Sequence, residues 1–262
     1  MTRPQAFQFI RTDLSDGVFT ITIVRPQVRN ALHPPACAEI GAALDAFEAD
    51  DAMRVAIITG EGDKAFSAGF DLRYAEEHPQ VYDDPLIGSE ITRRRGIGKP
   101  TIAAVNGLAL GLGFELALAC DLIIAAPHAK FGLPEPRVGL AAMAGGVVRL
   151  TRQIGAKRAL GIILTGRMVS AEEGQHAGFV NEVAVDPLMH CARRWAATIA
   201  EGGPLSLIAS KEMAYVGSGM ADLQAALDPR SYAAVLRLLQ SEDATEGRRA
   251  FLEGRKPQWR GR

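Results

Sequence analysis

Short apolar runs, each ended by a turn, recur through the first half of the chain. The first of them reads VFTITIV, is rich in β-branched residues and stops at an Arg-Pro pair. Runs of this length and composition, bounded by glycine or proline, indicate buried strands. Strands are therefore predicted over residues 18–24, 54–60, 101–107 and 121–127. Between the first two, apolar side chains at Ile40, Leu44 and Phe47 have helical spacing and predict a helix over 34–50.

The second half of the chain has the periodicity of helices. Apolar positions predict helices over 145–154, 157–164, 171–177, 188–200, 204–215, 222–239 and 242–254, and one short strand over 179–185. Because only helices follow residue 187, the chain is predicted to be an α/β core over 1–187 and a helical region over 188–262. The periodicity permits a doubly wound sheet or a stacked coil of repeated ββα turns. Residues 75–90 are polar, contain two prolines and are predicted to form a mobile surface loop, a kind of segment that often borders sites.

The composition is that of an ordinary globular protein. Hydrophobic residues make up 48% and charged residues 23% of the 262 positions, and the formal net charge is −1. A nearly neutral chain has no global field for polyanions, and the basic run RRRG at 93–96 is too short to predict nucleic-acid binding. No apolar run reaches the length of a membrane span, and the N-terminal segment lacks the apolar core of a secretory signal. A cytoplasmic location without a membrane partner is therefore expected.

Several familiar motifs are absent. The glycines of NGLALGLGFE do not have the GxGxxG spacing of a dinucleotide loop, and GEGDKAFSAG lacks the register of a P-loop. FSAGF lacks the GxSxG register of a nucleophile elbow, so Ser67 is predicted to be a turn hydroxyl. The histidines show no HExxH pattern, and the three cysteines have no CxxC spacing. The sequence therefore predicts no metal site and no disulfide framework, with Cys120 a small core residue.

Two glycine-containing turns are candidates for stabilising an anion. AFSAGFDL at 65–72 and NGLALGLGFELALAC at 106–120 each follow a strand and precede a segment that could be helical. Backbone N–H groups at a helix start point outward and, with the helix dipole, favour negative charge. Two such groups that converge could form an oxyanion hole, worth ~3–4 kcal/mol of transition-state stabilisation per donor. For each motif alone, glycines that merely permit a tight turn are the alternative.

Two glutamates have unusual surroundings. Glu115 lies in LGLGFELALACDLIIA, one of the most apolar runs of the chain, although glutamate is rarely buried unless it is paired. Glu135 lies between Pro134 and Pro136, which stiffen its backbone, and a rigid carboxylate suits positioned proton transfer. The alternatives are a solvent-facing helix edge for Glu115 and a surface proline turn for Glu135.

Taken together, four segments resemble the crotonase (enoyl-CoA hydratase/isomerase) superfamily. They are RPQVRNAL, RVAIITGEGDKAFSAGFDL, KPTIAAVNGLALGLGFELALACDLIIAAPHAKFGLPEPRVGL and LTGRMVSAEEGQHAGFVNEV. The resemblance runs from about residue 18 to the C-terminus, and the tail SEDATEGRRAFLEGRKPQWRGR is similar to that of carnitinyl-CoA dehydratases within the superfamily. It implies an α/β fold, a crotonase-like spiral of ββα units with a C-terminal helical trimerisation region.

The resemblance also implies the parts of a catalytic site. The oxyanion donors would be the N–H groups of Phe70 and Leu112, and Leu112 departs from the glycine that most relatives have there. Both positions that match the hydratase carboxylates are glutamate, Glu115 and Glu135. They would hold one water, with Glu115 aiding its activation and Glu135 exchanging a proton at Cα. The implied activity is reversible hydration of a 2-enoyl-CoA thioester, as in fatty acid metabolism; the alternatives are an isomerase, a lyase or a non-catalytic acyl-CoA-binding homologue.

Further implications concern the substrate and the assembly. The CoA-binding positions implied by the resemblance are Arg29, Ala31, Ala68, Phe70, Asp71, Leu72 and Phe251. The C-terminal position where relatives have a CoA-phosphate lysine is Gly254, and Arg255 or Lys256 could replace that charge. A trimethylammonium substrate would favour an aromatic wall, for which Tyr74 and Tyr82 are candidates. The implied partners are an acyl-CoA substrate, with no separate cofactor, and other copies of the chain in a homotrimer or a dimer of trimers.

Overall fold

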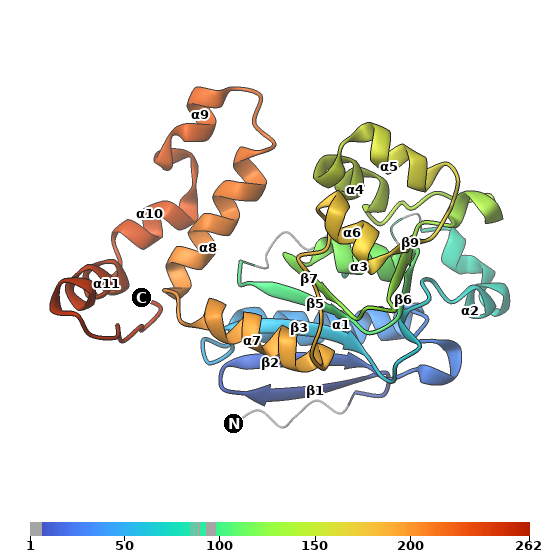
Figure 1. Cartoon of the computed structure of the whole chain (residues 1–262), viewed down its shortest axis with the longest axis horizontal. Coiled ribbons are helices and arrows are strands. Elements are labelled where there is room, and N and C mark those ends of the chain that lie inside the picture. Colours follow the sequence, from blue (N-terminus) through green and yellow to red (C-terminus); the bar gives the residue numbers. More distant parts are fainter. Residues whose placement is uncertain (1–6, 85, 87, 89, 93–97) are drawn as a thin grey trace.

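Two sheets form the centre of the computed structural model, which describes residues 7–84, 86, 88, 90–92 and 98–262 (Figure 1). The six-stranded sheet has the order β1-β2-β3-β5-β7-β10, and the four-stranded sheet has the order β4-β6-β8-β9. The strands are β1 (Ile10–Ser15), β2 (Val18–Ile23), β3 (Val55–Gly60), β4 (Ala65–Ser67), β5 (Thr101–Val105), β6 (Leu108–Leu110), β7 (Leu122–Ala125), β8 (Lys130–Gly132), β9 (Val169–Ser170) and β10 (Glu182–Val183). The basic run at 93–96 lies outside the described residues.

Successive strands alternate between the two sheets. β3 joins the larger sheet and β4 the smaller one before α2 (Leu72–Glu77), and β5 and β6 repeat this before α3 (Leu112–Ala119). β7 and β8 repeat it again before a 3-10 turn (Glu135–Val138) and α4 (Gly146–Ile154). β3, β5 and β7 are parallel neighbours, as are β4, β6 and β8, so each ββα unit advances by one strand in both sheets. This topology confirms the crotonase-like spiral and excludes a doubly wound sheet.

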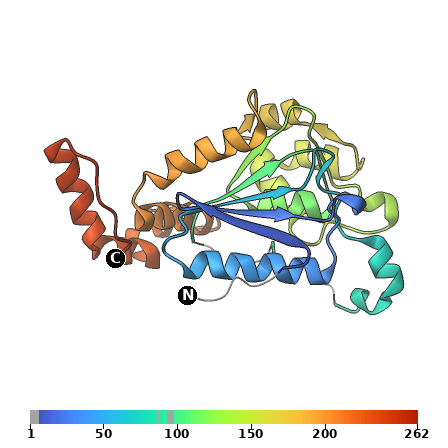
Figure 2. The ribbon, with the colours of Figure 1, turned by 90° about the horizontal axis from the view of Figure 1, so that it is seen from below.

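Helices cover the larger sheet on both faces. Along β3, Val55 and Ile57 belong to one apolar cluster with α7 (Leu188–Ala200), whereas Ala56 and Ile58 belong to another with α1 (Pro34–Ala49). Burial on both faces explains why these strands are continuous apolar runs rather than alternating ones. Figure 2 shows α1 and α7 on opposite sides of the strands. The domain boundary at residue 187 stays a prediction. A boundary there would assign α7 to the C-terminal region, although this helix covers the larger sheet.

The remaining helices lie above the smaller sheet or extend from the core. They are α5 (Ala156–Ile163), α6 (Ala171–Ala177), α8 (Pro204–Glu212), α9 (Leu223–Leu227), α10 (Ala233–Leu239) and α11 (Glu242–Glu253). α8 to α11 project away from the sheets in both ribbon views (Figures 1 and 2). Among the described residues, no helix has both the length and the apolar character that a membrane span requires.

Three local predictions are corrected by the structure. The single helix predicted over 222–239 is wrong: α9 ends at Leu227, a 3-10 turn spans Pro229–Ser231, and α10 follows. Proline at 229 lacks an N–H and disfavours a helical residue before it. The loop predicted over 75–90 is partly helical, since α2 reaches Glu77 and a 3-10 turn spans Pro79–Tyr82. The short strands β1, β4, β6, β8 and β9 were not predicted.

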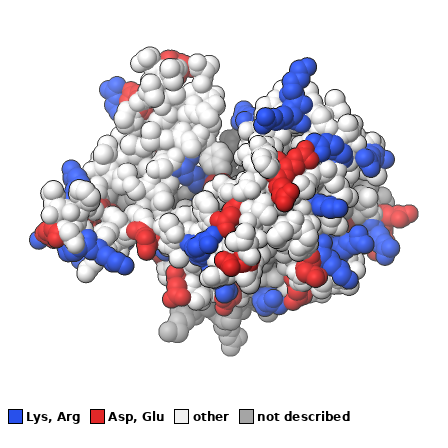
Figure 3. All heavy atoms as spheres, viewed as in Figure 1, with Lys and Arg blue, Asp and Glu red and all other residues white. Residues whose placement is uncertain are grey.

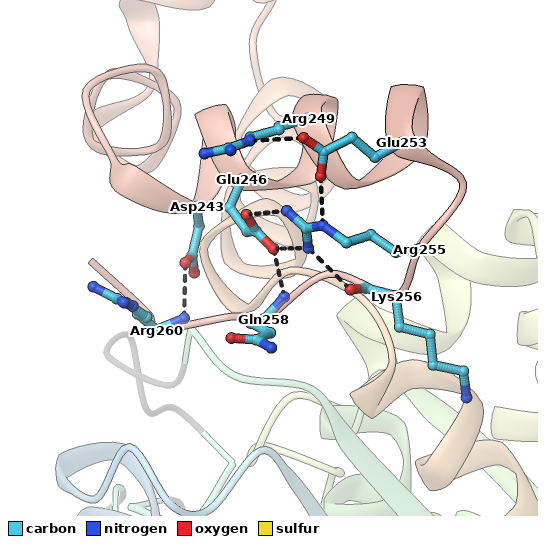
Figure 4. Close-up of polar contacts among 8 residues, drawn as sticks. All are labelled: Asp243, Glu246, Arg249, Glu253, Arg255, Lys256, Gln258 and Arg260. Carbon is cyan, nitrogen blue, oxygen red and sulfur yellow. Dashed lines mark hydrogen bonds and ion pairs between the residues drawn. The ribbon is translucent and has the colours of Figure 1, made fainter.

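The C-terminal tail folds back onto α11 through a set of polar contacts (Figure 4). Asp243 is 3% exposed, and its carboxylate accepts the N–H groups of Arg260 and Gly261, each at 2.8 Å. The indole N–H of Trp259 donates to the carbonyl oxygen of Glu201 at 2.8 Å. The tail therefore ties α11 to the segment that links α7 and α8.

Replacement of Asp243 by alanine should loosen this tail. Two backbone N–H groups would lose their shared charged acceptor, so the free energy of unfolding should fall by about 2–3 kcal/mol, measured by urea denaturation. The control is Arg249→Ala, which breaks an exposed ion pair with Glu253 (side chains 71% and 44% exposed) and should cost no more than about 0.5 kcal/mol. Equal losses in the two variants would contradict a structural role for Asp243.

Candidate functional site

Two backbone turns meet where β4 and β6 end. Because these strands are parallel neighbours, the turns that follow them emerge at the same edge of the sheet. Gly69 (φ +100°) and Gly111 (φ +51°) have positive φ angles, which glycine adopts without strain. A β-carbon added to Gly69 would lie 2.6 Å from the carbonyl oxygen of Leu110 and 3.4 Å from the nitrogen of Leu112. The structure thus brings the two predicted turns into direct contact.

Each turn carries a backbone N–H group that has no hydrogen-bond partner among the described residues. These are the N–H groups of Phe70, which follows Gly69, and of Leu112, which is the first residue of α3 and so one of the unpaired donors of a helix start. Leu112 has a helical backbone, and its side chain is 5% exposed within the core. The departure from glycine at this position therefore leaves the turn unstrained and the N–H free.

A further close contact fixes α3 against β4. A β-carbon on Gly113 would lie 2.4 Å from the carbonyl oxygen of Ser67 and 2.9 Å from its hydroxyl oxygen. Ser67 is fully buried, and its hydroxyl accepts the N–H of Gly69 at 3.2 Å. Ser67 is therefore a turn hydroxyl, as predicted, and Gly113 allows the helix to approach it.

Glu115 is buried, with only 3% of its surface exposed. Its Oε1 accepts the N–H of Gly146, at the start of α4, at 2.8 Å. Burial raises the pKa of Glu115 to about 7; the Gly146 N–H opposes this rise, and the charge of Glu135 adds to it. The solvent-facing alternative for Glu115 is thus wrong, and the carboxyl titrates near neutrality.

Glu135 begins the 3-10 turn that follows β8. A β-carbon on Gly111 would lie 3.0 Å from Oε1 of Glu135, so this carboxyl rests against the second glycine turn. Its Oε2 is buried and has no hydrogen-bond partner among the described residues. Burial raises the pKa of Glu135 as well. One of its oxygens is therefore available to a bound molecule.

The two carboxyls are close enough to interact although 20 residues separate them in the sequence. Glu135 rests against Gly111, and its charge raises the pKa of Glu115. Two neighbouring carboxyls with raised pKa values resist ionising together and can exchange a proton near neutrality. Beside them lie two free N–H donors, which can stabilise a developing oxyanion. Within the described part of the chain, no three His, Cys, Asp or Glu side chains gather in a way that could hold a metal ion.

Most of the predicted CoA positions lie on segments that adjoin the first turn. Arg29 is exposed, has a φ of +54°, and accepts the N–H of Ala68 at 2.9 Å through its carbonyl oxygen. Ala31 is buried, and its carbonyl oxygen accepts a hydrogen bond from the guanidinium of Arg25. Leu72 is 48% exposed at the first position of α2. These residues lie on segments next to the first turn, and their role in CoA binding stays a prediction.

Asp71 and the tyrosines have other contacts. The Asp71 carboxylate pairs with Arg25 at 2.9 Å and caps α2 by accepting the N–H of Tyr74 at 3.2 Å. The Tyr74 ring stacks on His78, with centroids 4.1 Å apart, while Tyr82 is 55% exposed. The roles predicted for these side chains in substrate binding stay predictions.

Phe251 lies apart from the two turns within one copy of the chain. It is 85% exposed on α11, which is at the opposite end of the molecule from α2 in both ribbon views (Figures 1 and 2). Gly254 ends this helix in a left-handed conformation (φ +66°). Arg255 is held by Glu246 and by a second carboxylate, whereas the side chain of Lys256 points away from this network (Figure 4). Of the two cations predicted to replace the lysine, Arg255 is thus already paired.

Two residues of the site were not identified from the sequence. Gly146 supplies the N–H that orients Glu115, and a Gly-Gly pair at the start of the helix predicted over 145–154 was the available signal. Arg25 was interpreted only as the end of a strand, but its buried guanidinium joins Ala31 and Asp71. Both contacts are tertiary, because they connect segments 31 and 46 residues apart in the sequence.

Comparison with known proteins agrees with this geometry. The family model described as enoyl-CoA hydratase/isomerase matches residues 13–262. A carnitinyl-CoA dehydratase from Salmonella arizonae is 40% identical over 261 residues, covering 96% of this chain and 98% of that protein. One from Salmonella typhi is 41% identical over 252 residues, covering 94% and 95%.

Solved structures show the same fold. An enoyl-CoA hydratase from Bacillus anthracis superposes with a TM-score of 0.91 at 35% identity, covering 97% of this chain and all of that one. A hydratase subunit from Geobacillus kaustophilus gives a TM-score of 0.87 at 39% identity, covering 98% and 99%. With a family model that matches nearly the whole chain and relatives of this identity and coverage, the chain belongs to the enoyl-CoA hydratase/isomerase (crotonase) family.

Proposed function

We propose that the chain is a hydro-lyase that reversibly adds water across the 2,3 double bond of a 2-enoyl-CoA thioester. The observation that carries this proposal is the pair of carboxyls, the buried Glu115 and the half-buried Glu135 with its buried Oε2, near two backbone N–H groups that have no partner among the described residues. The names of the relatives, enoyl-CoA hydratase and carnitinyl-CoA dehydratase, both describe addition or removal of water and support it. The carnitinyl relatives favour a carnitine-type acyl group as one substrate.

The two N–H groups would bind the thioester oxygen. When water adds at Cβ, the electrons of the double bond move toward the carbonyl, and the oxygen gains negative charge. The N–H groups of Phe70 and Leu112 then stabilise this enolate-like oxygen more strongly than the neutral carbonyl of the substrate. This difference lowers the barrier, because only interactions that strengthen in the transition state accelerate the reaction.

The two carboxyls would divide the proton transfers. The Glu115 carboxylate takes a proton from water as the water oxygen bonds to Cβ, and the Glu135 carboxyl gives its proton to Cα as the enolate collapses. One hydroxyl and one proton are thus added, and the pair ends with its single proton on the other carboxyl. Raised pKa values suit this exchange: the Glu115 carboxyl, with a pKa of about 7, can accept a proton near neutrality, and the raised pKa of Glu135 favours its protonated form.

The alternatives differ in how many carboxyls they need. An isomerase or a lyase on this fold begins from the same stabilised enolate, but a single base can suffice. A non-catalytic acyl-CoA-binding homologue needs neither carboxyl. Both carboxyls are present, and removing Glu115 and the Oε2 of Glu135 from water has an energetic cost, which favours the hydratase.

We also propose that the chain assembles as a homotrimer or a dimer of trimers through its C-terminal helices. Several large apolar side chains there are exposed in a single copy: Leu223 66%, Leu227 63%, Leu239 67%, Phe251 85% and Leu252 84%. Figure 3 shows that the lobe formed by these helices has wide areas without charged side chains. Apolar areas of this kind favour association with another protein surface. A cytoplasmic location and a part in fatty acid metabolism stay predictions.

Variants of the two carboxyls test the proposed activity. The wild-type protein should consume 2-enoyl-CoA, followed by the loss of the absorbance of the conjugated thioester, and should dehydrate carnitinyl-CoA in the reverse assay. Glu135→Gln and Glu115→Gln keep side-chain shape but remove the proton carrier, so each should lower kcat by about 100-fold or more. Glu172→Gln, an exposed substitution on α6, is the matched control and should leave kcat unchanged.

Two results would count against the hydratase. If the wild-type protein binds 2-enoyl-CoA but leaves it unchanged, the acyl-CoA-binding alternative is favoured. If Glu115→Gln still hydrates at the normal rate while Glu135→Gln does not, the reaction depends on one carboxyl and the two-carboxyl mechanism is wrong.

The pH dependence of hydration should report the ionisation of Glu115. Its carboxylate must be ionised to accept a proton from water, and its pKa is about 7. We therefore expect kcat/KM to rise between pH 5 and 7 as Glu115 ionises, and to fall at higher pH, where Glu135 loses the proton that it must donate. Steady-state rates across this range, in buffers of constant ionic strength, measure it. A profile that is flat between pH 5 and 8 would show that this group does not act as the base.

The same pKa predicts a pH-dependent cost to folding. Because the folded pKa of Glu115 is raised from 4.5 to about 7, the folded state favours the protonated form. The cost is absent below about pH 4.5, grows as the pH rises, and reaches about 3 kcal/mol above pH 7. Urea denaturation should thus show Glu115→Gln gaining stability relative to wild type between pH 4.5 and 8. Glu172→Gln should show no such gain, and equal differences at both pH values for Glu115→Gln would contradict the burial cost.

A further inference from the structure

The guanidinium of Arg25 is connected to the first oxyanion donor through a chain of hydrogen bonds. Its Nη1 donates to the carbonyl oxygen of Ala31. The same peptide group carries the N–H of Leu32, which donates to the carbonyl oxygen of Gly69 at 2.7 Å. The Gly69 carbonyl belongs to the peptide group that carries the N–H of Phe70, for which the described residues offer no acceptor. Two peptide groups in series therefore lie between a fixed positive charge and the proposed binding position of the thioester oxygen.

The geometry of the peptide group makes this chain directional. A trans peptide is planar, so its C=O and N–H point in opposite directions. Because the Gly69 carbonyl is held by Leu32, the Phe70 N–H must point away from Leu32. A donor to a carbonyl oxygen also polarises the attached N–H, and hydrogen bonds in series strengthen one another. A cation at the far end thus both aims and strengthens the last donor.

Arg25 is itself held firmly. Only 9% of its surface is exposed; its Nη2 pairs with Oδ2 of Asp71 at 2.9 Å, and its guanidinium carbon lies 5.7 Å from the centre of the Phe9 ring. Asp71 is 8% exposed, and although burial raises the pKa of its carboxyl, the Tyr74 N–H and Arg25 together lower it below the usual value. The pair is therefore ionised at neutral pH. The N–H of Asp71 donates to the Leu32 carbonyl oxygen at 2.8 Å, which holds the other side of Phe70.

We propose that Arg25, anchored by Asp71, is a positioning residue for the hydration reaction that orients and polarises the Phe70 N–H through the Ala31–Leu32 and Gly69–Phe70 peptide groups. The inference rests on the proposed function, because it assigns the Phe70 N–H to the thioester oxygen. Arg25 does not touch the substrate in this arrangement. It acts on the transition state through two peptide groups, so its loss should lower kcat more than it raises KM.

Arg25→Met is the decisive variant, since it keeps an unbranched side chain and removes the cation. We expect kcat for 2-enoyl-CoA hydration to fall about tenfold to 100-fold, less than complete loss of an oxyanion donor, with KM changed less than threefold. Arg25→Lys, which keeps a cation, should recover part of the loss. The matched control is Lys211→Met, which removes the cation of another half-buried pair, Lys211–Asp121 at 2.7 Å, and should lower stability while kcat stays within twofold of wild type.

Infrared difference spectroscopy of a bound saturated acyl-CoA separates this inference from the proposed function, because it needs no turnover. In the wild-type protein the thioester carbonyl stretch should move to lower frequency on binding, and Arg25→Met should reduce that shift while Lys211→Met keeps it. If Arg25→Met does not fold, Asp71→Asn, which keeps an acceptor for the Tyr74 N–H but frees Arg25, should reduce the shift in the same direction.

The outcomes are distinct. An unchanged carbonyl shift in Arg25→Met or in Asp71→Asn overturns the role of Arg25 whatever the activity. A reduced shift in a protein that does not hydrate 2-enoyl-CoA supports the role of Arg25 and rejects the hydratase. A fall in kcat that Lys211→Met matches would show that the loss comes from stability alone and would also overturn the proposal.

Discussion

The contact between the turn after β4 and the turn after β6 is the constraint on which the site depends. Gly69 meets the Leu110 carbonyl, and Gly113 meets Ser67, at distances that no β-carbon could tolerate. Parallel pairing of the two strands brings the turns to the same edge, but only glycine lets the turns approach this closely. The proposed oxyanion site therefore depends on backbone packing, and the side chains around it help to hold that packing.

The two carboxyls, Glu115 and Glu135, are withdrawn from water at an energetic cost, which their proposed role in proton transfer would explain. A buried carboxyl without a cation resists ionising, and the described structure offers Glu115 a backbone N–H rather than an ion pair. An arginine directly bonded to Glu115 would lower its pKa and stabilise the fold, but it would also make the carboxylate a poor base at neutral pH. The Arg25–Asp71 pair differs from Glu115 in this respect. Its ion pair keeps both groups charged, and neither group is proposed to transfer a proton.

The sequence predicts those parts of the fold that depend on local pattern. The apolar runs of β2, β3, β5 and β7 are long enough to be recognised, and the isolation of Glu115 in an apolar run marked it as unusual. β4, β6 and β8 have three residues each, too few for any periodicity, and exist because they pair with one another. Without them, a spiral cannot be distinguished from a doubly wound sheet. Two further contacts, of Arg25 with Asp71 and of Glu115 with Gly146, are also tertiary, so the local sequence pattern cannot predict them. The site residues were therefore predicted from the resemblance to a family.

Because both proposed oxyanion donors are backbone groups, the side chains at these two positions can differ without removal of a donor. Leu112 illustrates the point: its N–H has no partner among the described residues, while a methyl of its side chain lies 3.0 Å from the position that a β-carbon on Gly88 would occupy. The ring of Phe70 approaches the same position to 3.7 Å. Gly88, which lies between α2 and β5, thus packs directly on the side chains of both proposed donor residues. A change of residue 88, or of the side chain at 112, would therefore alter the packing beside the proposed donors without removing either N–H group.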